Sequence, residues 1–197
     1  MGDDNFYFSM KNINESIICA GFGGQGIMTL GKVLANAAMV AGYHVTWMPS
    51  YGAEVRGGTA HAMIKISSEP IASPMVREVD TAIIMNDPSL QKFGPKVKEG
   101  GLLIVNTSIV SAHPEKAGRD LVLAPLTDEA LEIGNIKTAN MIAVGIYIAI
   151  KGVLKENTVD KVMEKMAAGR EKILPVNRKA VERGMEIGQR QKAKGKG

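Results

Sequence analysis

Residues 16–26 read SIICAGFGGQG, a short apolar run that ends in a cluster of glycines. The β-branched residues of this run are typical of a buried parallel strand. Beyond the glycines, apolar residues recur at helical spacing until Gly42, at Ile27, Leu30, Leu34, Ala37, Ala38 and Ala41. This stretch therefore predicts a strand, a glycine turn and a helix, which together form the first unit of an α/β domain.

Further short apolar runs alternate with helical patterns along the chain. We expect strands over residues 43–48, 59–67, 81–85, 102–105 and 121–124, and mainly helices from residue 138 onward. Alternation of strands and helices favours a mostly parallel sheet that is covered on both faces. The predicted fold is an α/β three-layer sandwich with a mostly parallel, Rossmann-like sheet and a helical C-terminal region.

A length of 197 residues fits one domain with a single core, which we place at residues 15–188. Residues 1–14 show no periodicity and include a second Met at position 10, so we expect them to be disordered or non-native. Residues 189–197 are rich in Lys and Gly, and we expect a flexible basic tail there.

The composition excludes several classes of protein. The single cysteine, Cys19, rules out an intrachain disulfide, and it cannot hold an iron–sulfur cluster alone because a cluster needs about four thiolates. The chain has no apolar run of about 18 residues and no signal peptide, so we expect a cytoplasmic protein without a membrane span. The net charge is +4, but the basic C-terminal residues lack the aromatic or Arg-rich interleaving of a nucleic-acid-binding arm.

The segment Gly21–Gly26 satisfies the pattern G-x-G-x-x-G between a strand and a helix. Glycines there let the backbone approach an anion, and the free N–H groups and dipole of the helix start stabilise negative charge. The candidate ligand-binding residues are Gly23, Gly24, Gln25 and Gly26. A dinucleotide site also needs an acid at the end of the second strand, but residues 46–50 read TWMPS, so NAD is disfavoured.

A second glycine-rich segment, residues 50–58, reads SYGAEVRGG. Loops that leave the carboxyl ends of parallel strands converge on one edge of the sheet, so we expect this loop to flank the glycine turn. Arg56 would then clamp a phosphate or carboxylate. The candidate ligand-binding residues of this segment are Ser50, Tyr51, Arg56, Gly57 and Gly58. The alternative is a Glu54–Arg56 ion pair that only holds a tight turn.

Other polar residues carry weaker signals. Asn86-Asp87-Pro88 and Asn106-Thr107-Ser108 have the composition of helix caps and turns. Thr138-Ala139-Asn140 is either a cap of the apolar helix over residues 141–150 or a support for the glycine turn. Lys32 lies too far into its helix for a triphosphate-binding loop and is read as a solvated charge. The histidines lack metal-ligand spacing and no Ser-His-Asp arrangement occurs, so we predict no metal site and no catalytic residue.

Three motifs in order, GFGGQG at residues 21–26, SYGAEVRGG at residues 50–58 and KTANMI at residues 137–142, resemble the gamma subunit of 2-oxoacid:ferredoxin oxidoreductases. The resemblance covers residues 15–185 and is far more specific than one glycine motif. It implies a chain that assembles with alpha, beta and ferredoxin-like delta subunits, with ferredoxin as the external electron acceptor. Thiamine diphosphate and iron–sulfur clusters would then reside on the partner subunits only, and the chain alone would be inactive.

The resemblance also implies a role in converting a 2-oxoacid to an acyl-coenzyme A. We expect coenzyme A to bind at the two glycine-rich segments, since its phosphates suit a glycine turn and Arg56. Pyruvate, 2-oxoglutarate and branched-chain oxoacids are all family substrates, and 2-oxoglutarate is the preferred one here. Two alternatives remain: a purely structural assembly subunit that binds no small molecule, and a stand-alone dinucleotide-binding oxidoreductase. The apolar helix over residues 141–150 also suggests self-association of the isolated chain.

Overall fold

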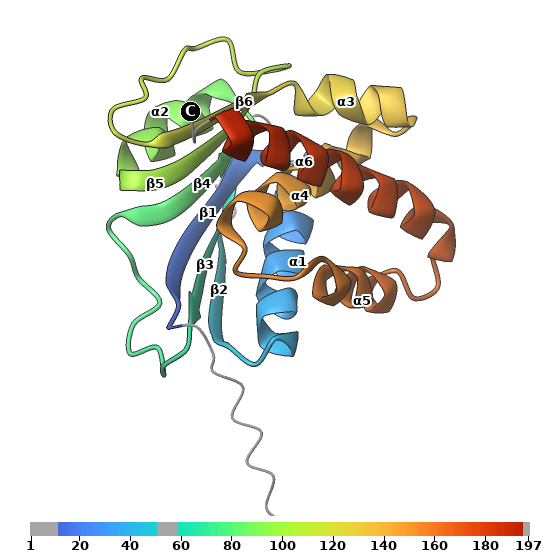
Figure 1. Ribbon diagram of the computed structural model, residues 1–197, viewed down its shortest axis with the longest axis horizontal. Helices are drawn as coiled ribbons and strands as arrows, with labels where there is room; N and C mark the ends of the chain where they lie inside the picture. Colours follow the sequence, from blue (N-terminus) through green and yellow to red (C-terminus); the bar gives the residue numbers. More distant parts are fainter. Residues whose placement is uncertain (1–11, 51–58, 195–197) are drawn as a thin grey trace, which may run out of the picture.

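The computed structural model describes residues 12–50 and 59–194 and folds them around one six-stranded sheet (Figure 1). Its strands are β1 (Asn14–Phe22), β2 (His44–Ser50), β3 (Thr59–Ser67), β4 (Val79–Ile84), β5 (Val97–Asn106) and β6 (Asp120–Ala124). Its α-helices are α1 (Ile27–Val40), α2 (Asp87–Phe93), α3 (Leu126–Ile133), α4 (Ala139–Lys151), α5 (Glu156–Met166) and α6 (Leu174–Lys194). Three short 3-10 helices, η1 (Gly94–Lys96), η2 (Ile136–Thr138) and η3 (Glu171–Ile173), complete the described part of the chain.

The strands lie in the order β2-β3-β1-β4-β5-β6. The pairs β1/β4, β4/β5 and β5/β6 are parallel, so the mostly parallel sheet predicted from the sequence is confirmed. Strand β3 differs, because it runs antiparallel to both of its neighbours, β1 and β2. Strand β2 therefore runs in the same direction as β1, and α1 is the crossover that connects these two strands. The insertion of β3 between them separates this sheet from a simple Rossmann unit.

Strand β2 is one edge of the sheet, and it extends two residues further than the sequence pattern indicates. We expected Pro49 to close the strand after Met48, but Pro49 pairs with Ala62 and Ser50 pairs with His61. Proline is tolerated on an edge strand because its missing N–H can face away from the sheet. The end of β2 is therefore fixed by pairing up to the last residue before the undescribed segment 51–58.

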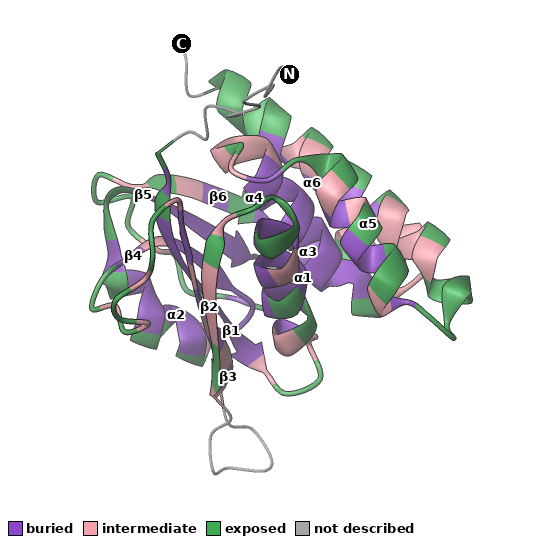
Figure 2. Cartoon of the chain, turned by 90° about the horizontal axis from the view of Figure 1, so that it is seen from below, coloured by how far each residue is buried: buried purple, intermediate pink, exposed green. Residues whose placement is uncertain are grey.

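Helices cover both faces of the sheet, as the three-layer prediction requires (Figure 2). On one face, α1 packs on β2 and β3 and is joined by α4, α5 and α6. On the other face, α2 packs on β1 and β4. Each face has its own apolar core, one including Ile17, Leu34 and Ile142 and the other including Ile18 and Phe93.

Helix α6 crosses α4 at very short range through glycines. A Cβ at Gly145 would collide with the carbonyl of Val181, and a Cβ at Gly184 would collide with the carbonyl of Ile142. Only glycine allows two helix backbones to approach this closely. The contact fixes α6 over the helical layer that contains the candidate site.

Helix α6 continues to Lys194, six residues beyond Gly188, where we expected the flexible basic tail to begin. The residues involved are mainly Lys, Gln, Arg and Ala, which are good helix formers. At the other end, Asn14 already pairs with Ser67 in the sheet. No helix within residues 12–50 and 59–194 is long and apolar enough to cross a membrane.

Candidate functional site

The glycine turn between β1 and α1 adopts a conformation that only glycine reaches easily. Gly24 and Gly26 have φ values of 94° and 74°, in the left-handed region that side chains with a Cβ rarely enter. Gly21, at the end of β1, is required for a different reason. A Cβ there would lie 2.8 Å from both the Ile27 side chain and the Met85 Cβ, so glycine lets the helix start pack against the residue that follows β4.

The side chain of Gln25 holds the turn from inside. Its carboxamide oxygen accepts a hydrogen bond from the Phe22 N–H at 2.6 Å, and its amide nitrogen donates to the Met85 carbonyl at 3.0 Å. Both ends of the carboxamide are therefore used within the protein. The structure places Gln25 as a support of the turn, while Gly23 and Gly24 lie on its exposed side.

Asn140, at the start of α4, braces the same turn from the helical layer. Its Nδ2 donates to the carbonyl of Gly26 at 3.1 Å, and the residue is 5% exposed. Of the two roles considered for residues 138–140, support of the glycine turn is therefore confirmed. Thr138 does not cap α4 with its side chain; its hydroxyl donates to the Asn135 carbonyl at 2.8 Å.

The N-terminus of α1 has neither a side-chain cap nor an acid in its own first turn. The helix is 14 residues long, so its positive N-terminal end faces the turn with unsatisfied N–H groups. An anion is the natural partner for such an end.

Ser50 lies on the same edge of the sheet as the glycine turn. Both Ser50 and Ala20 pair with His61 on β3, so Ser50 is one strand away from the end of β1, about 10 Å across the sheet. Of the second glycine-rich segment, only Ser50 is described, and it lies at the same edge of the sheet as the glycine turn. The other candidates of that segment, Tyr51, Arg56, Gly57 and Gly58, lie outside the described residues.

A groove of about 520 Å³ opens beside the turn and runs along the outer side of α1 toward α5 and η3. Its lining includes Gly24, Gly26, Lys32, Lys137, Met166 and Arg170. The described residues that line it include three cationic side chains and no Asp or Glu. We call it the basic groove.

The basic groove was not predicted from the sequence. The sequence predicts a solvated charge at Lys32, and the residue is exposed. It also lines the groove, and its Nζ lies 5.3 Å from the centroid of the Trp47 ring. Lys137 belongs to the KTANMI motif, which was the available signal. Arg170 carried no signal, since it follows α5 in a short connection and reaches the groove only through the packing of α5 beside α1.

The other polar clusters at the strand ends serve as turn formers, as expected. Asn86 caps α2 by accepting from the Ser89 N–H at 2.9 Å. Asn106 accepts from the Thr127 N–H at 3.3 Å and donates to the Thr127 hydroxyl at 2.9 Å. These side chains secure loops at the sheet edge.

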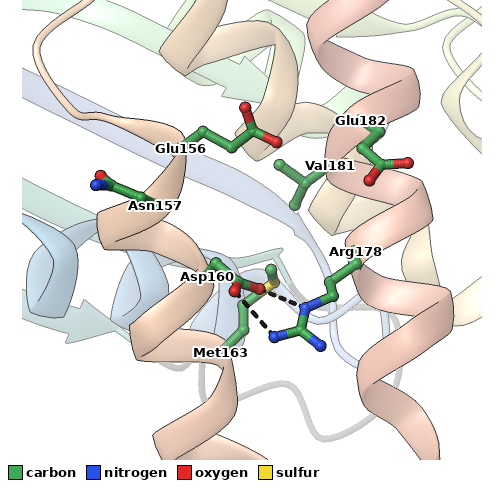
Figure 3. Close-up of a pocket in the computed structure, with 7 residues that line it drawn as sticks. All are labelled: Glu156, Asn157, Asp160, Met163, Arg178, Val181 and Glu182. Atoms are coloured by element: carbon green, nitrogen blue, oxygen red, sulfur yellow. Dashed lines mark hydrogen bonds and ion pairs between the residues drawn. The ribbon is translucent and has the colours of Figure 1, made fainter.

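A second cavity, of about 280 Å³, lies between α5 and α6 and has the opposite charge (Figure 3). Glu156, Asp160 and Glu182 line it, together with Arg178. Two hydrogen bonds, of 2.6 and 2.9 Å, join the Arg178 guanidinium to the Asp160 carboxylate and hold the pKa of that carboxyl below its usual range. Arg178 is the one cation among the described residues that line this cavity, and it is paired with Asp160, so an anionic ligand is disfavoured there.

The described residues carry no group of His, Cys, Asp or Glu side chains that could hold a metal ion. Cys19 is fully buried, and burial raises the pKa of its thiol, so it is a core residue without nucleophilic character. The site supplies hydrogen-bond donors, cations and apolar surface. Such an arrangement has the chemistry that suits an anionic ligand.

Comparison with known proteins identifies relatives along most of the chain. The family model described as pyruvate ferredoxin/flavodoxin oxidoreductase matches residues 16–187. The ketoisovalerate oxidoreductase subunit VorA of Methanothermobacter marburgensis is 36% identical over 169 residues, or 85% of this chain and 35% of VorA. This chain therefore spans about a third of that relative. The 2-oxoglutarate synthase subunit KorC of Archaeoglobus fulgidus is 34% identical over 89% of this chain and 88% of KorC.

Solved structures share the fold. The gamma subunit of a keto/oxoacid ferredoxin oxidoreductase from Geobacter sulfurreducens is 27% identical, with a TM-score of 0.75 over 88% of this chain and 98% of that one. A 2-oxoglutarate:ferredoxin oxidoreductase from Magnetococcus marinus, solved with 2-oxoglutarate, coenzyme A and succinyl-CoA bound, has a TM-score of 0.82. Its sequence is 24% identical, and the match covers 91% of this chain and 32% of the Magnetococcus chain. At this level of identity the comparison shows a shared fold.

Proposed function

Because this chain belongs to the pyruvate ferredoxin/flavodoxin oxidoreductase family, we propose that it is the gamma subunit of a 2-oxoacid:ferredoxin oxidoreductase and forms one wall of the coenzyme A site. The enzyme would decarboxylate a 2-oxoacid oxidatively and pass the acyl group to coenzyme A. KorC, which this chain matches over nearly its whole length, is named for 2-oxoglutarate, and we take 2-oxoglutarate as the preferred substrate.

The observation that carries the proposal is the uncapped N-terminus of α1 behind the glycine turn. Gly24 and Gly26 bring the backbone into position, Asn140 and Gln25 fix it, and the helix end has neither a side-chain cap nor an acid in its first turn. A phosphate group complements such an end. Coenzyme A carries three phosphates and is the phosphorylated reactant of the proposed reaction.

The proposed chemistry takes place on partner subunits. We assign thiamine diphosphate and the iron–sulfur clusters to alpha, beta and ferredoxin-like delta chains, with ferredoxin as the external acceptor and the cytoplasm as the compartment. The segment that begins at Ser50 would form the opposite wall of the coenzyme A site, with Tyr51, Arg56, Gly57 and Gly58 toward the ligand. This chain then contributes binding and assembly, and it is inactive alone.

A purely structural subunit is the second candidate. It is favoured by the way that Gln25, Asn140 and Gly21 use the turn for internal support and close packing. In that case the glycines would serve only to join this chain to its partners.

Substitution at Gly24 separates the two candidates. A Cβ at Gly24 meets no atom within 4 Å, and Asp and Asn both tolerate left-handed backbone, so Gly24→Asp and Gly24→Asn differ mainly by a carboxylate at the helix end. In the complex purified through this chain, we expect the KM for coenzyme A to be about tenfold higher in Gly24→Asp than in Gly24→Asn, with the KM for the oxoacid unchanged. Arg56→Ala should also raise the KM for coenzyme A.

Equal KM values for coenzyme A in both Gly24 variants would favour the structural subunit. The identity of the partners is tested in the same preparation by mass spectrometry of the co-purified chains. We expect a thiamine-diphosphate-binding subunit and a ferredoxin-like subunit. Absence of both would contradict the proposed complex.

A further inference from the structure

One face of the sheet is covered by helices over only part of its width. Helix α2 packs on β1 and β4, whereas the helix that packs on β2 and β3 is α1, on the opposite face (Figure 2). Mostly parallel sheets normally carry helices on both faces. On the α2 side, β2 and β3 therefore lack the helical layer that covers their neighbours, within the described part of the chain.

The strand register shows which side chains this uncovered area presents. Met63 pairs with Ile18, which belongs to the core beneath α2, and across the edge of the sheet Met48 pairs with Met63. Residues that pair share a face, and so do residues two apart along one strand. We call this area the open sheet face. Its side chains are Thr46, Met48, His61, Met63 and Lys65.

The centre of the open sheet face is apolar. Met48 is 38% exposed, and Met63 is half-buried at the border of the core beneath α2. Methionine side chains are flexible and polarizable, and they are common at surfaces that bind helices. From His61 to Lys65 strand β3 rises about 14 Å, which is the length of about nine helical residues. One short helix therefore matches the area in length.

Two lysines lie beside the open sheet face. The Nζ atoms of Lys92 and Lys96 lie 5.2 and 5.6 Å from the centroid of the Phe93 ring. The centroid of this ring lies 4.9 Å from that of His61. Burial lowers the pKa of His61, and the positive charges of both lysines lower it further. The two lysines thus add positive charge at the His61 end of the open sheet face.

Neither of these lysines has a counter-charge in the structure. Both are exposed, and neither forms an ion pair with a carboxylate of residues 12–50 and 59–194. By contrast, Lys98, two residues after Lys96, pairs with Asp80 at 2.9 Å. A surface with an apolar centre and unpaired cations at its border complements an acidic partner.

A second copy of this chain fits the same surface poorly. Two open sheet faces packed together would bring Lys65, Lys92 and Lys96 of both copies into one interface. Like charges that face each other across an interface oppose association. An acidic partner is attracted by the same three charges, so charge complementarity selects it over a second copy.

We propose that the open sheet face docks an acidic amphipathic helix of a partner subunit. The apolar side of this helix covers Met48 and Met63, and carboxylates beside it pair with Lys92 and Lys96. The helix extends the layer that α2 begins. That the partner belongs to a 2-oxoacid:ferredoxin oxidoreductase rests on the proposed function, whereas the surface and the chemistry of its partner rest on the residues of this chain.

The first test measures assembly with charge-reversed variants of the full-length chain. Lys92→Glu/Lys96→Glu is compared with Lys161→Glu/Lys165→Glu, which reverses two exposed lysines of α5 at the same spacing. The Kd for the co-purified partner subunits should rise at least about tenfold in the first variant and stay within about twofold of wild type in the second. An unchanged Kd in Lys92→Glu/Lys96→Glu, or an equal rise in both variants, would overturn the proposal.

The second test uses the wild-type complex and does not depend on the folding of a variant. A carbodiimide joins lysine amines directly to neighbouring carboxylates, and mass spectrometry identifies the joined peptides. We expect Lys92 and Lys96 to be joined to one partner peptide whose apolar residues recur at helical spacing. The proposal is wrong if neither lysine reacts, if they are joined to a second copy of this chain, or if the joined peptide lacks that pattern.

A charge exchange then tests whether these groups meet in the interface. Replacing the joined carboxylates of the partner by Lys should bring the Kd of Lys92→Glu/Lys96→Glu back to within about threefold of wild type. No recovery would contradict the pairing. If the co-purified chains include no thiamine-diphosphate subunit, the proposed function fails, whereas the crosslinks and the charge exchange still decide whether the open sheet face binds an acidic helix.

Discussion

The two ends of β1 differ in whether the charged groups around them have partners within the protein. We call the start of the strand, with Glu15 and Asp80, the paired end, and the carboxyl end, with the glycine turn, the unpaired end. At its start, the Glu15 carboxylate accepts from the Thr81 hydroxyl at 2.7 Å and pairs with Lys151 at 3.0 Å, while Asp80 accepts from the Ser16 N–H at 2.8 Å. At its carboxyl end, the N-terminus of α1 and the cations of the basic groove have no acidic partner among the described residues. The first end is thus paired within the fold, whereas the second end carries unpaired positive charge, as the proposed ligand site requires.

The largest expected effect comes from removing the ion pair between Glu15 and Lys151 at the start of β1. The Glu15 side chain is 8% exposed, so Lys151→Met leaves a buried carboxylate without its counter-charge. Removing one partner of a buried ion pair costs about 3 kcal/mol, and we expect this loss in the free energy of unfolding measured with urea. The KM of the assembled complex for coenzyme A should stay unchanged, because Lys151 pairs with Glu15 at the start of β1, at the opposite end of the strand from the glycine turn.

Lys98→Met is the matched control for Lys151→Met. Lys98 also pairs with a carboxylate at this end, Asp80 at 2.9 Å, but its side chain is 44% exposed. An exposed pair contributes about 0.5 kcal/mol. If the two substitutions lowered the free energy of unfolding equally, burial would not determine how much each ion pair contributes to stability.

A smaller effect is expected from a substitution in the glycine turn at the carboxyl end of β1. A Cβ at Gly26 would collide with the Asn140 side-chain amide, and the φ of 74° adds left-handed strain, so Gly26→Ala should lower the free energy of unfolding by about 2 kcal/mol. In the assembled complex it should also raise the KM for coenzyme A, since the turn is displaced. Gly23→Ala is the control, because a Cβ there meets nothing within 4 Å. If both variants unfold at the same urea concentration, Asn140 does not hold the turn.

Local sequence patterns were enough to predict the strand, turn and helix around Gly21–Gly26. The apolar periodicity indicates the strand and the helix, and the glycines supply the positive φ values that the turn requires. The family followed from three short motifs and is confirmed. Direction was not predictable for β3: its alternation indicates a strand with one buried face, but the pattern is the same for parallel and antiparallel neighbours. Support of the glycine turn by residues 138–140 was one of two predicted roles, and the hydrogen bond from Asn140 to Gly26, 114 residues away in sequence, selects it. The position of Arg170 in the basic groove was not predictable, since it depends on how α5 packs beside α1.

The smallest expected effect is on the pH dependence of stability, which should differ in sign between Glu15 and Asp80, the two carboxylates at the start of β1. Burial raises the pKa of Glu15 above its ordinary value of 4.5 and outweighs the opposing influence of Lys151 and Thr81. The folded protein therefore binds this proton more readily than the unfolded chain. The stability that Glu15 contributes is present below about pH 4.5 and is lost as the pH rises through the folded pKa.

Asp80 has the opposite sign. Burial opposes its ionisation, but hydrogen bonds from Ser16 and Lys98 prevail and lower its pKa below the ordinary value of 3.8. Its contribution is present above that value and is lost as the pH falls through the folded pKa. Urea unfolding of the wild type, Glu15→Gln and Asp80→Asn between pH 3 and 7 checks both signs. Relative to wild type, Glu15→Gln should gain stability as the pH rises, whereas Asp80→Asn should lose it. If the stability difference from wild type changed with pH in the same direction for both variants, Glu15 and Asp80 would titrate as one coupled pair, and no separate sign could be assigned to either.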